Sequence, residues 1–125
     1  MRLLLDTHVY LWWLEDHPKL STRARRLITE ASEVYVSSAS IWEASIKAGI
    51  GKLEVDVDEL VGQIQVSGFL ELPVSAVHAA AVKSLPAVHN DPFDRMLVAQ
   101  AICEPLRFLT HDDKLRGYSE LVEII

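Results

Sequence analysis

The chain has 125 residues, half of them apolar, which is the size of one domain with one hydrophobic core. A net charge of −6 argues against a broad basic surface for nucleic acid, although acids gathered in one cleft can be neutralised by divalent cations. The single cysteine, Cys103, excludes an internal disulfide, and the apolar runs are shorter than the ~20 residues of a bilayer span, so we expect a soluble, cytoplasmic protein without a membrane segment.

Short apolar strands and capped amphipathic helices alternate along the whole chain. The first half contains a strand at 3–5, helices at 9–14 and 22–31, a strand at 34–36 and a helix from the serines at 37–40 to the glycines at 49–51. The second half contains a helix at 59–66, a strand at 69–72, helices at 75–83 and 93–104, a strand at 107–110, a helical turn at 112–115 and a strand at 121–125. The expected helix caps are Ser21, Asp56 or Asp58, and Asp91 followed by Pro92, and the helix at 59–66 should turn Leu60, Val61 and Ile64 inward. This alternation predicts an α/β fold of three layers, with a central parallel sheet of about five strands between helices, as a single domain over residues 1–125.

Four acids from distant parts of the chain fall at one edge of such a sheet. Asp6 follows the first strand and Asp112 the fourth, while Glu43 and Asp94 lie early in the helices that start at the same edge. The carboxyl ends of parallel strands and the amino termini of the following helices share one edge, which is where ligands bind in open α/β sheets. We therefore expect these four side chains to meet.

Asp94 carries the strongest local signal of the four. Leu97, Val98 and Ala101 follow it at i+3, i+4 and i+7, which puts its carboxylate in line with the buried stripe of its helix. A purely structural role, in which Asp94 stabilises the helix amino terminus, remains open.

The other acids have structural alternatives as well. Glu43 and Lys47 are spaced to form an ordinary surface ion pair, which contributes little to stability. Asp6 can serve only as a cap or turn residue, and Asp112 and Asp113 only as an exposed turn. Each alternative is credible for one residue, but the placement of all four acids on one edge favours a common site.

Carboxylates without a nucleophile or a phosphate-binding loop indicate a site for hard cations. Mg²⁺ and Mn²⁺ prefer oxygen ligands and typically use a few carboxylates together with substrate phosphate. Two such ions about 4 Å apart can generate a hydroxide and stabilise the leaving oxygen in phosphodiester hydrolysis. The sequence therefore points to metal-dependent phosphodiester chemistry.

Four motifs in this order resemble the PIN-domain nucleases, in particular the VapC-type toxins of prokaryotic toxin–antitoxin pairs. The motifs are LLLDTH at the start, VSSASIWEASIKAGIGKL, NDPFDRMLVAQA and the closing LTHDDKL, and together they cover nearly the whole chain. Carried over to this sequence, the family's core acids fall on Asp6, Glu43 and Asp94, and its more variable fourth acid on Asp112, with Asp113 as the adjacent competitor.

The resemblance implies a PIN-like fold and a Mg²⁺- or Mn²⁺-dependent endoribonuclease that cuts RNA. It also implies a homodimer that is inhibited by a small antitoxin protein lying across the active-site groove. In this reading Asp6, Asp94 and Asp112 bind metal, and Glu43 binds metal or positions the attacking water. Supporting polar positions fall on Thr7, Ser38 and Thr110.

Basic and imidazole side chains flank the acidic motifs. We interpret the histidines as orienting or loop residues rather than ligands, because oxygen-rich Mg²⁺ sites rarely recruit imidazole. They are His8, His89 and His111. The basic residues are candidates for phosphate contact, with solvated surface charge as the alternative for each. They are Lys47, Arg95, Lys114 and Arg116.

The adjacent Trp12 and Trp13 cannot both face the same core direction on a helix. Either at least one is exposed and contributes to a dimer or antitoxin interface, or both are buried between the sheet and a neighbouring helix.

Two other functional classes share this size and acidity. A receiver-like signalling domain needs an acidic pair after the first strand and an acceptor Asp at the end of the third, whereas this chain has the single Asp6 and ends its third strand at Pro73. A non-catalytic acidic binding module also remains open, and chelator-sensitive RNA cleavage would exclude it.

Overall fold

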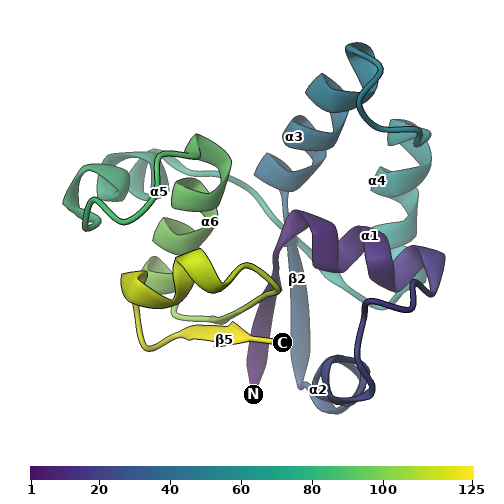
Figure 1. Cartoon of the computed structure of the whole chain (residues 1–125), viewed down its shortest axis with the longest axis horizontal. Coiled ribbons are helices and arrows are strands. Elements are labelled where there is room, and N and C mark those ends of the chain that lie inside the picture. Colours follow the sequence, from purple (N-terminus) through teal and green to yellow (C-terminus); the bar gives the residue numbers. More distant parts are fainter.

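The computed structural model describes all 125 residues and contains one sheet of five parallel strands (Figure 1). The strands are β1 (Arg2–Leu5), β2 (Glu33–Ser37), β3 (Leu70–Leu72), β4 (Arg107–Thr110) and β5 (Val122–Ile124). All four neighbouring pairs are parallel. This confirms the predicted parallel sheet, with Phe69 lying just before the third strand rather than within it.

The strand order is β3-β2-β1-β4-β5, so the direction of winding reverses between β1 and β4. Such a switch point leaves a crevice at the carboxyl ends of the two strands, where ligands bind in open sheets. Asp6 follows β1 and Asp112 follows β4, so two of the predicted site residues flank this crevice. The order also differs from the 2-1-3-4-5 arrangement of receiver domains, which argues against the receiver-like alternative.

The helices begin at the predicted polar caps. They are α1 (Thr7–Glu15), α2 (Thr22–Glu30), α3 (Ser38–Gly49), α4 (Val57–Val66), α5 (Ala76–Ala81) and α6 (Pro92–Cys103). The Asp56 carboxylate, and not that of Asp58, caps α4 by accepting the Glu59 N–H. The helix predicted at 75–83 ends as α5 at Ala81 and tightens into a 3₁₀ turn, η1 (Val82–Ser84), shortly before Pro86. A second 3₁₀ turn, η2 (Asp113–Tyr118), is longer than the predicted one.

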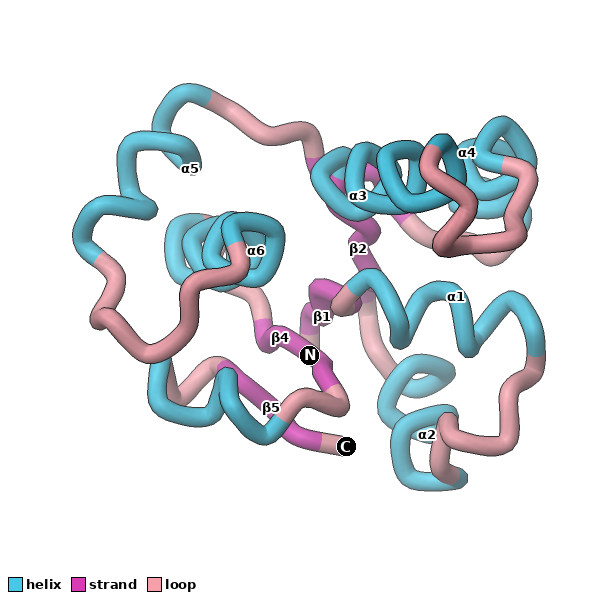
Figure 2. The backbone as a smooth tube through the Cα atoms, turned by 45° about the horizontal axis from the view of Figure 1, so that its top comes forward, coloured by secondary structure: helices cyan, strands magenta, loops and turns pink.

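The helices cover both faces of the sheet, which confirms the three-layer architecture (Figure 2). Leu3 and Leu5 of β1 point to one face and pack in a core cluster with residues of α1, α2 and α4. Leu4 points to the other face and packs with residues of α6 and η2. Val61 of α4 was expected to face inward, but it is 48% exposed, because α4 buries only the stripe through Leu60 and Ile64.

The two tryptophans of α1, Trp12 and Trp13, are both half-buried. Neither is therefore the exposed aromatic residue expected for a dimer or antitoxin interface. Trp13 packs against Phe69, and Trp12 packs against His111 on the side of the predicted site. The exposed tryptophan is instead Trp42 of α3, at 64%. No helix combines the length and apolar character needed to cross a membrane.

Candidate metal centre

The four predicted acids line one cavity of about 310 Å³ at the carboxyl ends of β1 and β4. They come from four segments: Asp6 follows β1, Glu43 lies on α3, Asp94 lies on the first turn of α6, and Asp112 follows β4. The four acids therefore share one cavity, as expected, and among them Asp94 and Asp112 bring donor atoms within 4.8 Å of each other. Whether these residues perform catalysis remains a prediction.

The Asp6 carboxylate is held at the bottom of this cavity. It is 6% exposed, and its two oxygens accept hydrogen bonds from the Thr7 N–H at 2.7 Å and from the Thr110 hydroxyl at 2.6 Å. The first bond makes Asp6 the cap of α1, as the structural alternative expected, and the same residue also lines the cavity. Burial raises the pKa of Asp6, and the bond from Thr110 opposes that rise.

Glu43 forms the expected ion pair with Lys47, with 2.6 Å between Oε2 and Nζ. The pair is not an ordinary surface pair, because Glu43 is 5% exposed and both side chains line the cavity. The hydrogen bond to Glu43 raises the pKa of Lys47. Lys47 therefore supplies a fixed positive charge next to the acids.

Asp94 is the most perturbed carboxylate of the site. Burial raises its pKa to about 8, and the neighbouring Asp6, Asp91, Glu43 and Asp112 add to the rise in that order. Its side chain lies in line with the buried stripe of α6, since the three residues that defined the stripe are at most 1% exposed. Capping of the helix is done by Asp91, whose Oδ1 accepts the Phe93 and Asp94 N–H groups.

Asp112, and not its neighbour Asp113, lies at the cavity. The Asp112 N–H donates to the Thr110 hydroxyl at 3.1 Å, and that hydroxyl in turn donates to Asp6. Asp113 is turned outward and pairs with the exposed Arg116 at 2.8 Å. The geometry therefore places the fourth acid at Asp112, and Thr110 links it to the first.

Of the basic and polar residues predicted to support the site, some line the cavity and others only connect elements of the fold. Lys114 lines the cavity with Lys47, whereas Arg95 donates to the main-chain oxygens of Val82 and Pro86. Arg116 is occupied by its pair with Asp113, so neither arginine lines the cavity, although Arg95 donates to the main-chain oxygen of His89 at 3.4 Å. The side chains of Thr7 and Ser38 tie elements together and make no hydrogen bond to the acids: the Thr7 hydroxyl donates to Ser40, and the Ser38 hydroxyl accepts the Val74 N–H.

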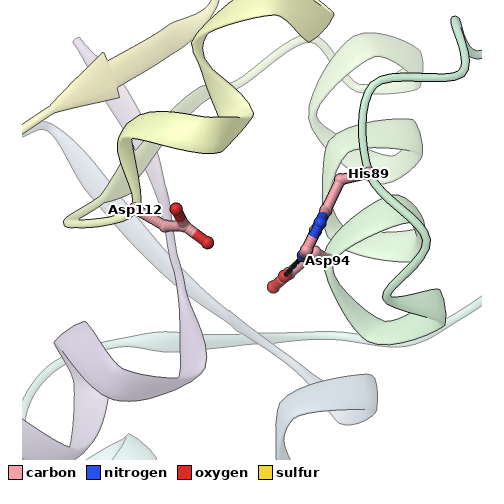
Figure 3. Close-up of side chains that lie close together, drawn as sticks. All are labelled: His89, Asp94 and Asp112. Atoms are coloured by element: carbon pink, nitrogen blue, oxygen red, sulfur yellow. Dashed lines mark ion pairs between the residues drawn. The ribbon is translucent and has the colours of Figure 1, made fainter.

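Three further residues line the cavity although the sequence did not predict them as part of the site. Asp91 was identified only as a helix cap, although a cap directly before Asp94 necessarily points toward the same helix amino terminus. Trp12 lies one helical turn after His8 and lines the cavity. Its apolar neighbours along the chain gave no sign that it belongs to the site. His89 lies within 3.3 Å of Asp94, and Figure 3 shows Asp112 facing this pair.

The donor set fits a divalent cation of the hard type. Five carboxylates line the cavity against two lysines, and the charges of the four other acids all raise the pKa of Asp94. Donor atoms of His89, Asp94 and Asp112 lie within 4.8 Å of one another. Uncompensated carboxylate oxygens at this density are the ligands that Mg²⁺ and Mn²⁺ use. The residues of the cavity can therefore hold such an ion.

We expect Thr110→Val to destabilise the protein at neutral pH, because the buried Asp6 carboxylate loses a charge-assisted hydrogen bond. A buried acceptor left without its donor costs about 1–3 kcal/mol of unfolding free energy. Urea denaturation measures the loss. Thr110→Ser keeps the hydroxyl and serves as the control, and equal stability of the valine and serine variants would contradict the role of this bond.

Comparison with known proteins gives a consistent family. The PIN domain family model matches residues 3–121. Ribonuclease VapC22 of Mycobacterium tuberculosis is 30% identical over 118 residues, which cover 93% of this chain and 91% of that protein. In fold, the chain is similar to VapBC2 from Rickettsia felis bound to a DNA fragment from their promoter, with a TM-score of 0.70 and 16% sequence identity. The match covers 100% of this chain and 98% of the other. It is also similar to a toxin–antitoxin complex from Klebsiella pneumoniae, with a TM-score of 0.62 and 17% sequence identity, over 98% of this chain and 99% of the other. The chain belongs to the PIN-domain family.

Proposed function

We propose that this chain is a metal-dependent endoribonuclease, the toxin of a toxin–antitoxin pair, and that its acidic cavity hydrolyses RNA phosphodiester bonds. The observation that carries the proposal is the convergence of Asp6, Glu43, Asp94 and Asp112 in one cavity at the switch point of the sheet. The relative named Ribonuclease VapC22 supports the choice of RNA. We treat residues 1–125 as a single PIN domain, since one sheet runs through them.

The four acids receive distinct roles in this proposal. Asp6, Asp94 and Asp112 bind Mg²⁺ or Mn²⁺, and Glu43 binds metal or orients the attacking water. A bound divalent ion supplies a nucleophile at neutral pH and polarises phosphoryl oxygens. The bond from Thr110 keeps the Asp6 carboxylate in one orientation, and the bond from Lys47 does the same for Glu43.

The two lysines of the cavity are suited to the substrate phosphates. Lys47 and Lys114 both line the acidic cavity. An ammonium group there contacts a phosphate as a point charge and positions the strand without reading its sequence. A small basic rim of this kind is compatible with the negative net charge of the whole chain, because the bound ions neutralise the acids.

Partner proteins are the second part of the proposal. We assign the acidic groove to a small antitoxin, supported by the similarity to a toxin–antitoxin complex. We assign to a second copy of this chain the exposed apolar stripe formed by Trp42 and Ile46 of α3 and by Ile50, the residue that follows the helix; they are 64, 41 and 62% exposed. Light scattering that gave the mass of one chain would contradict the homodimer. The free Cys103 supports a reducing compartment such as the cytoplasm.

Chelation tests the catalytic proposal directly. Purified protein, freed of antitoxin, should cleave RNA in Mg²⁺ or Mn²⁺, lose cleavage in EDTA and recover it when the ion is restored in excess. Gel analysis of a labelled RNA measures the cut. Cleavage that persists in EDTA would contradict a metal-dependent reaction, and an acidic binding module would cleave under neither condition.

A further inference from the structure

One imidazole lies among the carboxylates of the cavity. His89 Nε2 is 3.3 Å from Asp94 Oδ2, and donor atoms of His89, Asp94 and Asp112 all lie within 4.8 Å of one another. Figure 3 shows the Asp112 carboxylate facing the His89–Asp94 pair from the opposite wall. Two donors that share an ion at ~2.1 Å are about 3 Å apart when adjacent and about 4 Å apart when opposite. The three side chains therefore lie close to the spacing that one ion requires.

The ring of His89 is not needed to hold its loop in place. The main-chain N–H donates to the Tyr118 hydroxyl at 2.9 Å, and that hydroxyl donates back to the main-chain oxygen of His89 at 2.7 Å. Arg95 supports the same arrangement through the Tyr118 hydroxyl at 3.1 Å. The backbone is thus fixed by other residues, and the imidazole is directed into the cavity.

The two other histidines of the cavity form no ion pair with its acids. His8 stacks on Trp12, with 6.3 Å between the ring centroids. His111 packs edge-on against the same indole, and its Nδ1 lies 2.8 Å from the main-chain oxygen of Ile125. His89 alone among them pairs with an acid of the site.

We propose that His89 is a ligand of the metal centre and that its nitrogen makes the centre prefer Mn²⁺ to Mg²⁺. The inference rests on the proposed metal-dependent function and corrects our interpretation of His89 as an orienting residue. Mg²⁺ is a hard ion that keeps its waters and selects oxygen donors. Mn²⁺ shares the preference for carboxylates but, as a first-row transition ion, gains more than Mg²⁺ from one imidazole nitrogen in an oxygen-rich site. An imidazole beside Asp94 and Asp112 therefore favours Mn²⁺ over Mg²⁺.

Pulsed electron paramagnetic resonance of Mn²⁺ bound to the protein tests the proposal without any substrate. The parent protein should show coupling between the ion and a nitrogen, and the pattern should change when histidine is labelled with ¹⁵N. His89→Gln should abolish the coupling and weaken Mn²⁺ binding by about tenfold or more in titration calorimetry. Mg²⁺ binding should weaken much less. His111→Gln, matched in chemistry, should keep the coupling.

The outcomes separate this inference from the proposed function. Absence of nitrogen coupling in the parent protein, persistence of the coupling in His89→Gln, or an equal loss of Mn²⁺ and Mg²⁺ affinity would each overturn His89 as a ligand. The parent spectrum decides the matter even if the variant fails to fold. If the parent protein still cleaves RNA with Mg²⁺, the proposed nuclease function stands without the His89 ligand. A parent protein that neither binds metal nor cleaves RNA would contradict both the inference and the proposed function.

Discussion

Asp94→Asn should abolish RNA cleavage while it stabilises the metal-free protein. Asparagine keeps the size of the side chain but removes a charged ligand from a group of five carboxylates, so we expect cleavage to fall by at least about a hundredfold. The pKa of Asp94 is raised to about 8, which means that its charge is disfavoured in the fold. Removing the ionisable group should raise the melting temperature by roughly 3–6 °C once solvent screening of this partly exposed site is allowed for.

Asp113→Asn is the matched control for this variant. It removes the same charge from the neighbourhood of Asp112, but Asp113 is exposed and pairs only with Arg116. We expect cleavage and melting temperature close to those of the parent. Calorimetry and a gel assay of labelled RNA measure both properties. If Asp94→Asn cleaves at the parental rate, the catalytic assignment of the cavity is wrong.

The elements of this fold could be predicted because their signals are local. A run such as Leu3 to Leu5 between a charge and a turn residue indicates a buried strand in any context, and Ser21 or Asp91 marks the start of a helix through its own side chain. Parallel strands then bring Asp6 and Asp112 to one edge by topology alone. These steps require no knowledge of how the helices pack.

Features that depend on packing could not be predicted from the same patterns. Strand order decides that β4 lies next to β1, and this neighbourhood allows the Thr110 hydroxyl to reach Asp6. The spacing of Glu43 and Lys47 describes a helix pair but not the cavity that buries it. Likewise, no periodicity separates Trp12, which lines the site, from Trp42, which faces solvent.

The stability of the metal-free protein should fall as pH rises, and a divalent cation should reverse that fall. Both Asp6 and Asp94 have a raised pKa in the fold, so the unfolded chain ionises first. For Asp94, the favourable contribution is complete below the ordinary value of 3.8 and is lost as pH rises to about 8. A cation that binds the ionised acids of the folded state acts in the opposite direction. At a concentration a hundred times its dissociation constant it adds about 2.7 kcal/mol.

Calorimetry from pH 5 to 8, with and without Mn²⁺ or Mg²⁺, measures both effects. Sodium chloride at matched ionic strength is the control, because general screening weakens the repulsion among the carboxylates without binding to them. The divalent ion should raise the melting temperature most near pH 8, where the acids are ionised, and little near pH 5, where Asp94 holds its proton. Asp94→Asn should lose most of the stabilisation by metal. An equal shift in sodium chloride would show that the cavity responds to ionic strength alone, and the carboxylates would then be a charged rim rather than a metal centre.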